Sequence, residues 1–277
     1  MLPLPPQLEL KQLSKAFRIQ VWNILFEEFE RTQRFSSVSP STLGADWPAV
    51  LKQVWFKLKT AAHDEFDDSV YGQSKQIKAL VYSRPYNEVF DFIERLLEHE
   101  YSCVNGIREK IERAFTDCRM AYRLANGKTV QQVGSEEHAQ AIDLAYSSIS
   151  EQKFSGARTH LARSAEQLRE GNWRDSIRES MHAVVSVCRT IDPTAKKLSD
   201  ALSNIDRDHP LHGGLTRAFG SLYGWVSDDK GGIRKEILEE KHGEVDEELA
   251  MFMNFSCAAF ISYILAKTDS QVTGSTL

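Results

Sequence analysis

Hydrophobic residues recur at intervals of three and four along nearly the whole chain, with charged residues between them. Such stripes occupy residues 10–30, 46–58, 86–101 and 105–119 in the first half. This spacing places the apolar side chains on one face of an α-helix. Asp46 and Asn105 stand where two of these helices are expected to begin, and either side chain can act as an N-cap. The pattern predicts an all-α protein.

Residues 121–133 break the helical pattern. Two short runs, 121–125 and 128–133, flank the pair Asn126-Gly127. Asn-Gly readily adopts the positive φ angles of a type I′ turn, which joins the two strands of a β-hairpin. An isolated two-stranded ribbon is marginally stable in water, so we expect this one to lean on neighbouring helices. Ser135 is then expected to cap a helix that begins at Glu136.

The second half of the chain is predicted to be a helical bundle. A polar stretch near residues 150–155 marks the expected boundary, which gives an N-terminal module at 1–150, a bundle at 151–270 and a flexible tail at 271–277. Helices are expected at 156–170, 173–191, 193–205, 210–226 and 245–267, with a short piece at 233–241. The apolar run Met251–Ala266 is shorter than the roughly 20 residues of a membrane span, so we predict a buried helix there.

Composition narrows the class of protein. With 277 residues, 42% of them hydrophobic and 26% charged, the chain fits one large or two ordinary globular domains. Its formal net charge of −5 gives no overall attraction to nucleic acid or to an anionic membrane, so a polyanion site must be a local basic patch. The four cysteines have no metal-binding spacing and follow no secretory leader, which favours a reducing cytoplasm.

A stripe of cationic side chains runs along the helix expected at 173–191. Its members recur at the helical spacing beside the apolar face: Arg174, Arg178, His182, Val185 and Arg189. Guanidinium groups bind phosphate and an imidazole exchanges protons near neutral pH, so RNA is the first ligand to consider. The alternative is a solvated helix flank whose arginine stems cover the edge of the core.

Other histidines offer weaker signals. His160 lies on the preceding helix, where it either extends the basic surface or is simply solvated. His209 and His212 have a helical metal-ligand spacing, but no thiol or obvious carboxylate accompanies them, so we expect no metal site. The sequence also contains no P-loop and no dinucleotide-binding or nucleophile-elbow motif, and we expect no cofactor.

An ordered set of segments resembles bacterial proteins that pair an AbiJ N-terminal domain with a C-terminal HEPN-like helical domain. The segments are residues 13–25, 86–97, 121–128, 154–161, 176–180, 187–189, 222–224, 232–234 and 257–263. The resemblance covers nearly the whole chain. It implies a protein of abortive infection, the suicide-type defence against phage, with a HEPN-like bundle that is often dimeric and often travels with a cognate partner protein.

Many HEPN domains are metal-independent ribonucleases that use an Arg and a His separated by four to six residues. Read with the cationic stripe, the resemblance implies Arg178, His182 and Arg234 as catalytic candidates. Arg174, Arg189 and Lys235 are the matching candidates for contacts with RNA phosphates.

The sequence departs from the HEPN pattern in three respects. Three residues separate Arg178 from His182, Lys235 stands where relatives tend to carry a histidine, and Val185 stands where they tend to carry a glutamate. Two function classes therefore stay open. One is an RNA-binding domain that cleaves RNA without a metal, and the other is a non-catalytic scaffold or antitoxin-like protein.

Overall fold

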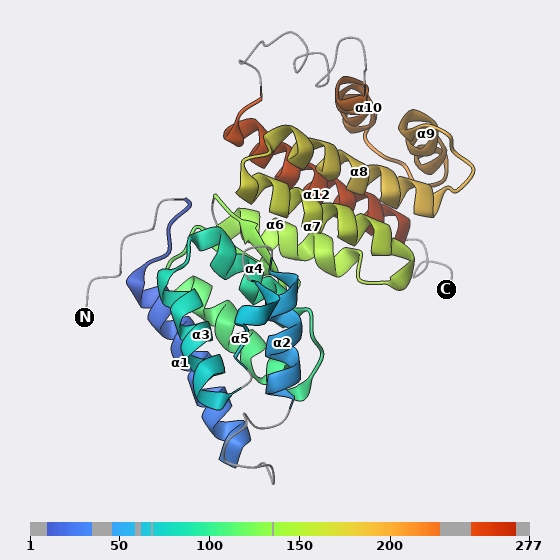
Figure 1. Cartoon of the computed structure of the whole chain (residues 1–277). Coiled ribbons are helices and arrows are strands. Elements are labelled where there is room, and N and C mark those ends of the chain that lie inside the picture. Colours follow the sequence, from blue (N-terminus) through green and yellow to red (C-terminus); the bar gives the residue numbers. More distant parts are fainter. Residues whose placement is uncertain are drawn as a thin grey trace, which may run out of the picture. The chain divides into compact units, whose positions relative to one another are not determined.

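The computed structural model describes residues 10–34, 46–58, 62–67, 69–134, 136–227 and 245–269 (Figure 1). Its contacts divide the chain into two compact units, Met1–Gly134 and Ser135–Leu277. Helices build both units, and the strands among the described residues form one hairpin. The all-α prediction is therefore confirmed. The division falls earlier than the boundary near residue 150 that the sequence predicts, because helix α6 (Glu136–Ser148) packs with the C-terminal helices.

The N-terminal unit contains five described α-helices. They are α1 (Lys15–Arg34), α2 (Trp47–Lys57), α3 (Val70–Ser83), α4 (Tyr86–Leu97) and α5 (Ser102–Asp117), with a 3-10 turn η1 (His63–Glu65) between α2 and α3. Helix α1 packs against α3 and α5, and α2 packs against α4. Helix α3, which starts after Ser69, is not predicted by the hydrophobic pattern. The Ser69 hydroxyl accepts the Gly72 N–H at 3.0 Å and so caps the helix.

Of the two N-caps predicted in this unit, Asp46 stands at the N-cap position of α2, whereas Asn105 does not begin a helix. Asp46 precedes α2, but its side chain makes no capping hydrogen bond. Pro48 occupies the first turn and has no N–H to offer, which removes one of the usual capping donors. Asn105 lies inside α5, and its amide instead donates to the carbonyl of Glu100 at 3.4 Å.

Aromatic rings fill the centre of the N-terminal core. Phe90 on α4 is fully buried, and its ring centroid lies 5.8 Å from that of Phe115 on α5 and 4.7 Å from that of Tyr122. The ring of Phe17 on α1 lies 4.8 Å from that of Phe115. Three helices and the hairpin therefore share one aromatic cluster.

The hairpin forms where the sequence predicts it. Strand β1 (Tyr122–Ala125) pairs antiparallel with β2 (Thr129–Gln132), and the connecting Asn126 and Gly127 have φ angles of +51° and +64°. Side chains from the helices hold it in place. The Glu94 carboxylate accepts the Val130 N–H at 2.7 Å, and Arg108 donates to the carbonyl of Gly127. The ribbon thus depends on its neighbours, as expected for an isolated hairpin.

The C-terminal unit is a helical bundle. Its described elements are α6, η2 (Gln152–Phe154), α7 (Ser155–Glu170), α8 (Trp173–Ile191), α9 (Leu198–Asp208), α10 (Gly213–Ser227) and α12 (Glu247–Asp269). Figure 1 shows α6, α7, α8 and α12 running alongside one another, and α12 contacts the other three. Helix α8 also contacts α9 and α10. The predicted piece at 233–241, the cap at Ser135 and the tail at 271–277 lie outside the described residues.

Helix α9 begins later than the predicted start at Pro193. The Asp192 carboxylate accepts the Thr194 N–H at 3.0 Å and the Thr194 hydroxyl at 2.6 Å. An aspartate that binds the backbone two residues ahead stabilises a turn in competition with helix. Helix α9 therefore begins only at Leu198.

Helix α12 is the buried helix expected from the apolar run, but length is not the reason. It spans 23 residues, and its length and composition alone would allow it to cross a membrane. Of its most apolar window, 61% is buried inside the protein. Burial against α6, α7 and α8, rather than a short apolar run, is what supports its assignment as a core helix.

Small polar side chains occupy the contact between α7, α8 and α12. Ser164 Oγ on α7 lies 2.6 Å from Ser180 Oγ on α8, and it accepts the side-chain N–H of Asn254 on α12 at 2.8 Å. The Ser176 hydroxyl donates to the carbonyl of Ser164 at 2.9 Å. All four side chains are buried. Hydrogen bonds therefore offset the cost of placing these polar groups inside the bundle.

A glycine sets the connection between α7 and α8. Gly171 has φ of +80°, and the N–H of Asn172 donates to the carbonyl of Gln167 at 2.9 Å. This is the bond that closes a Schellman C-cap. We expect Gly171→Ala to lower the free energy of unfolding of the C-terminal unit by about 1 kcal/mol, because a β-carbon is disfavoured at positive φ. A β-carbon would meet no atom within 4 Å there, so the effect isolates the backbone.

Urea denaturation followed by circular dichroism measures this cost, with Gly220→Ala as the matched control. Gly220 lies in α10, and a β-carbon there also meets no atom within 4 Å. Its backbone lacks the positive φ of Gly171, so alanine should stabilise by about 0.5–1 kcal/mol. Equal effects of the two substitutions would contradict the assignment of Gly171 as a conformational requirement.

Candidate functional site

Helix α8 carries the whole cationic stripe and begins and ends where the sequence predicts. Its inward face is built from Ile177, Met181, Val184 and Cys188, all of them fully buried. This face fixes the rotation of the helix, so the neighbouring stripe is held at the edge of the core. The apolar spacing therefore positions the stripe without any contribution from a ligand.

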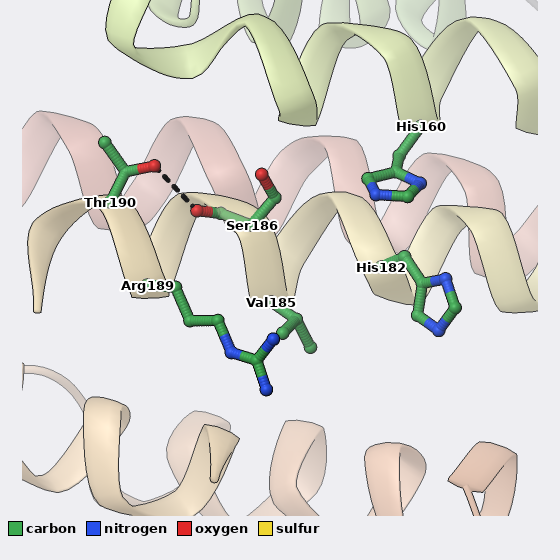
Figure 2. A pocket seen from close by; sticks show the side chains of 6 residues that line it. All are labelled: His160, His182, Val185, Ser186, Arg189 and Thr190. Carbon is green, nitrogen blue, oxygen red and sulfur yellow. Dashed lines mark hydrogen bonds between the residues drawn. The ribbon is translucent and has the colours of Figure 1, made fainter. Parts of the chain in front are cut away.

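One end of the stripe opens on a pocket of about 380 Å³. Its lining consists of His160, His182, Val185, Ser186, Arg189 and Thr190 (Figure 2). Helix α7 supplies His160, and α8 supplies the rest. The Arg189 side chain is exposed and forms no salt bridge with any residue that the structure describes. The pocket thus combines a guanidinium with two imidazoles.

Helices α7 and α8 approach closely at Ser186, one of the residues that line this pocket. A β-carbon on Gly156 would lie only 2.8 Å from Ser186 Oγ. The absence of a side chain at Gly156 therefore lets α7 come near to α8 beside the pocket. The Thr190 hydroxyl donates to the Ser186 carbonyl at 2.9 Å, which orients a second polar side chain of the lining (Figure 2).

The structure separates the predicted site residues. Arg178 Nη2 lies 2.7 Å from Asp175 Oδ1, so a neighbouring carboxylate already compensates its charge, and Arg178 does not line the pocket. Arg174 does not line it either. Arg234 and Lys235 lie outside the described residues. Of the predicted residues, the pocket therefore brings together His182 and Arg189.

The surroundings of His182 favour a neutral imidazole. Burial lowers the pKa of His182, and the nearby positive or ionisable groups His160, Arg178 and Arg189 lower it further, whereas Glu179 raises it. The ring of His182 lies 5.3 Å from that of His160, at an interplanar angle of 71°. A neutral imidazole has one nitrogen lone pair available to accept a proton or to bind a metal ion.

Two residues of the site, Glu179 and His160, do not belong to the cationic stripe that the sequence predicts. Glu179 Oε2 lies 2.7 Å from His160 Nδ1, across the contact between α8 and α7. An ionised carboxylate only accepts hydrogen bonds, so Nδ1 of His160 carries the hydrogen. The spacing of Glu179 and His182, three residues apart on one helix, was a readable signal. The pairing with His160 depends on the packing of two helices and was not.

The fold and the pocket define an all-helical protein with a cationic, histidine-containing pocket in its C-terminal unit. A family model, AbiJ N-terminal domain 4, matches residues 2–148, and the chain belongs to this family. Membership connects the protein with abortive infection, a form of defence against phage. Comparison with curated proteins and with solved structures found no match.

Proposed function

We propose that the C-terminal unit is a HEPN-like domain that binds RNA at the His182–Arg189 pocket and cleaves it, as part of a cytoplasmic abortive-infection protein. The observation that supports this proposal is one open pocket lined by His182, whose pKa is lowered by burial, and by a guanidinium without a salt-bridge partner among the described residues. Guanidinium binds phosphate through parallel hydrogen bonds, and Arg189 takes this role in place of Arg178. Because the chain as a whole carries a net negative charge, phosphate binding depends on this local cationic pocket.

The proposed reaction needs two proton transfers and one phosphate contact. His182 accepts the proton of the ribose 2′-hydroxyl, and the 2′-oxygen then forms a bond to the adjacent phosphorus. The bond between phosphorus and the 5′-oxygen breaks, and His160 donates a proton to that leaving oxygen. Arg189 stabilises the negative charge that grows on the phosphate oxygens. The products are a 2′,3′-cyclic phosphate and a 5′-hydroxyl end.

Cleavage of labelled tRNA and total RNA by the full-length protein in EDTA tests the proposal. His182→Ala is expected to slow cleavage by about 10²–10⁴-fold, the usual contribution of a general base. Arg189→Gln should weaken RNA binding by about 10–100-fold, because a charge-assisted hydrogen bond is worth about 1.5–3 kcal/mol. Cleavage by the wild type should fall as the pH drops through the lowered pKa of His182 and its imidazole becomes charged.

Arg207→Gln is the matched control for charge. Arg207 is an exposed arginine on α9, and it does not line the pocket. RNA binding by this variant should stay near that of the wild type at the same salt concentration. Cleavage that survives His182→Ala, or equal losses from the Arg189 and Arg207 substitutions, would contradict the assignment.

A second candidate is a non-catalytic interaction protein. Three large apolar side chains among the described residues of the C-terminal unit are exposed: Leu144 on α6 at 59%, Phe252 on α12 at 58% and Leu215 on α10 at 40%. Exposed apolar side chains of this size are suited to a homodimer contact or to a cognate defence partner. A stable dimer in light scattering, together with no salt-sensitive RNA binding by the wild type, would favour this candidate over the ribonuclease.

A further inference from the structure

Three side chains beside the pocket form a group with the composition of a metal site. His160, Glu179 and His182 each offer one ligand atom, and these atoms all lie within 4.8 Å of one another. None of the three is fully exposed, and the side chains of His160 and Glu179 retain 28% and 20% of their accessible surface. Two packed helices supply them, so their backbones are held in place before any ion binds.

We propose that His160, Glu179 and His182 bind one Zn²⁺ ion. Two imidazoles and one carboxylate are a ligand set that zinc adopts when it keeps a fourth position open. Nitrogen ligands favour zinc over magnesium or calcium, which prefer oxygen. Only the His209–His212 pair is considered as metal ligands from the sequence, and spacing along the chain does not bring His160 to Glu179 and His182, because His160 comes from another helix.

The spacing of the cluster is close to what a tetrahedral ion requires. Ligand atoms at about 2.0–2.2 Å from zinc lie about 3.3 Å from one another. The His160 Nδ1–Glu179 Oε2 distance of 2.7 Å would lengthen as the imidazole hydrogen moves to Nε2 and frees Nδ1 for the ion. The other separations, at most 4.8 Å, would shorten by up to about 1.5 Å. Side-chain rotation achieves shifts of this size without moving the helices. Because His160 and His182 also line the pocket, the fourth position faces open space that can hold a water molecule.

The charges near the cluster act in both directions: Arg189 on the same pocket opposes a cation, whereas the carboxylate within the cluster attracts it. A metal ligand must be unprotonated, and burial already favours neutral His182. Glu179 supplies a negative charge against Zn²⁺, and Asp175 compensates the nearby Arg178. The thiols that could compete for zinc, Cys188 and Cys257 of the same unit, are buried, and burial raises the pKa of each to about 12.

Zinc binding and RNA cleavage would exclude each other at this site. An ion bound to His182 occupies the lone pair that accepts the 2′-hydroxyl proton, so zinc inhibits cleavage; this consequence rests on the proposed function. The binding itself does not. Its test needs no RNA, and the two proposals can therefore fail separately.

The binding test uses full-length protein treated with a chelator and then dialysed. Zinc titration by calorimetry should give one ion per chain, and Co²⁺ as a probe should produce the intense visible bands of four-coordinate cobalt. His160→Ala and Glu179→Gln should each weaken binding by at least about 100-fold, the upper end of the cost of losing an outer-shell partner. Circular dichroism of each variant, recorded alongside, identifies any loss that is due to misfolding.

His212→Ala is the matched control. His212 is an exposed histidine of the same unit and belongs to the His209–His212 pair that the sequence offers as a weaker metal candidate. Binding by this variant should equal that of the wild type. Weaker binding in His212→Ala with no change in His160→Ala would place the ion elsewhere, and absence of a one-to-one zinc complex in the wild type would overturn the proposal.

Discussion

Replacing Phe90 with alanine is expected to lower the free energy of unfolding of the N-terminal unit by about 3–5 kcal/mol. Phe90 is fully buried at the centre of the aromatic cluster, with the rings of Phe115 and Tyr122 at 5.8 and 4.7 Å. Alanine would remove the ring and leave a cavity between α4, α5 and β1. Two packed helices and a hairpin tied by hydrogen bonds can collapse into such a space only in part.

Hydrogen exchange of peptides from residues 69–134 during a urea titration measures this loss within the intact chain. Phe26→Ala is the control, because the Phe26 side chain on α1 is 45% exposed and therefore contributes less to the core than Phe90 does. Its substitution should cost less than about 1 kcal/mol. Protection of the C-terminal unit should be nearly unchanged in both variants. Equal losses for Phe90 and Phe26 would show that the aromatic cluster is not the centre of stability.

Replacing Ser164 with leucine is expected to destabilise the C-terminal unit by about 3 kcal/mol or more. The serine is fully buried where α7, α8 and α12 meet, and its Oγ lies within 2.6–2.8 Å of Ser180 Oγ and Asn254 Nδ2. Leucine would overfill this contact, which costs about 1–3 kcal/mol. It would also remove the oxygen that Asn254 uses, and loss of one buried hydrogen-bond partner costs about 1–3 kcal/mol.

The adjacent position provides the control for Ser164. Arg163 lies one residue earlier on α7 and is exposed, so Arg163→Leu changes the same helix without entering the contact. Its effect should stay within about 0.5 kcal/mol. Ser164→Ala separates the two causes, because it removes the oxygen without adding volume. Thermal denaturation in which Ser164→Leu matches Arg163→Leu would contradict the tight helix contact.

The sequence predicts elements better than it predicts their ends. Helix α8 has its predicted bounds because apolar residues at strict helical spacing fix both its length and its buried face. Helix α3 was missed, since its buried positions Ile77, Leu80 and Val81 form a short stripe within a polar segment. Asp46 takes its predicted N-cap position but makes no side-chain capping bond, and Pro48 in the first turn has no N–H to donate. Asn105 fails as a cap because α5 already begins at Ser102.

Only the residues of the candidate site that lie on helix α8 could be predicted from the sequence. His182 and Arg189 share a face of α8, so helical periodicity brings them to one surface. His160 reaches the pocket from α7, and no spacing along the chain indicates which side chains meet across two helices. Nor does the periodicity distinguish Arg178 from Arg189, although a carboxylate three residues away compensates the first. That difference depends on rotamers, and the sequence pattern does not encode it.

Helix α6 has a dual membership. The residues matched to the AbiJ family continue through 148, yet α6 packs on α12 within the C-terminal bundle. A gene fusion that attached this family segment to a different C-terminal domain would also transfer α6, and α6 needs an apolar surface to pack against. During evolution, the segment can therefore be joined only to helical bundles that offer a surface for α6. Cutting the chain after residue 148 would expose the part of α12 that α6 buries.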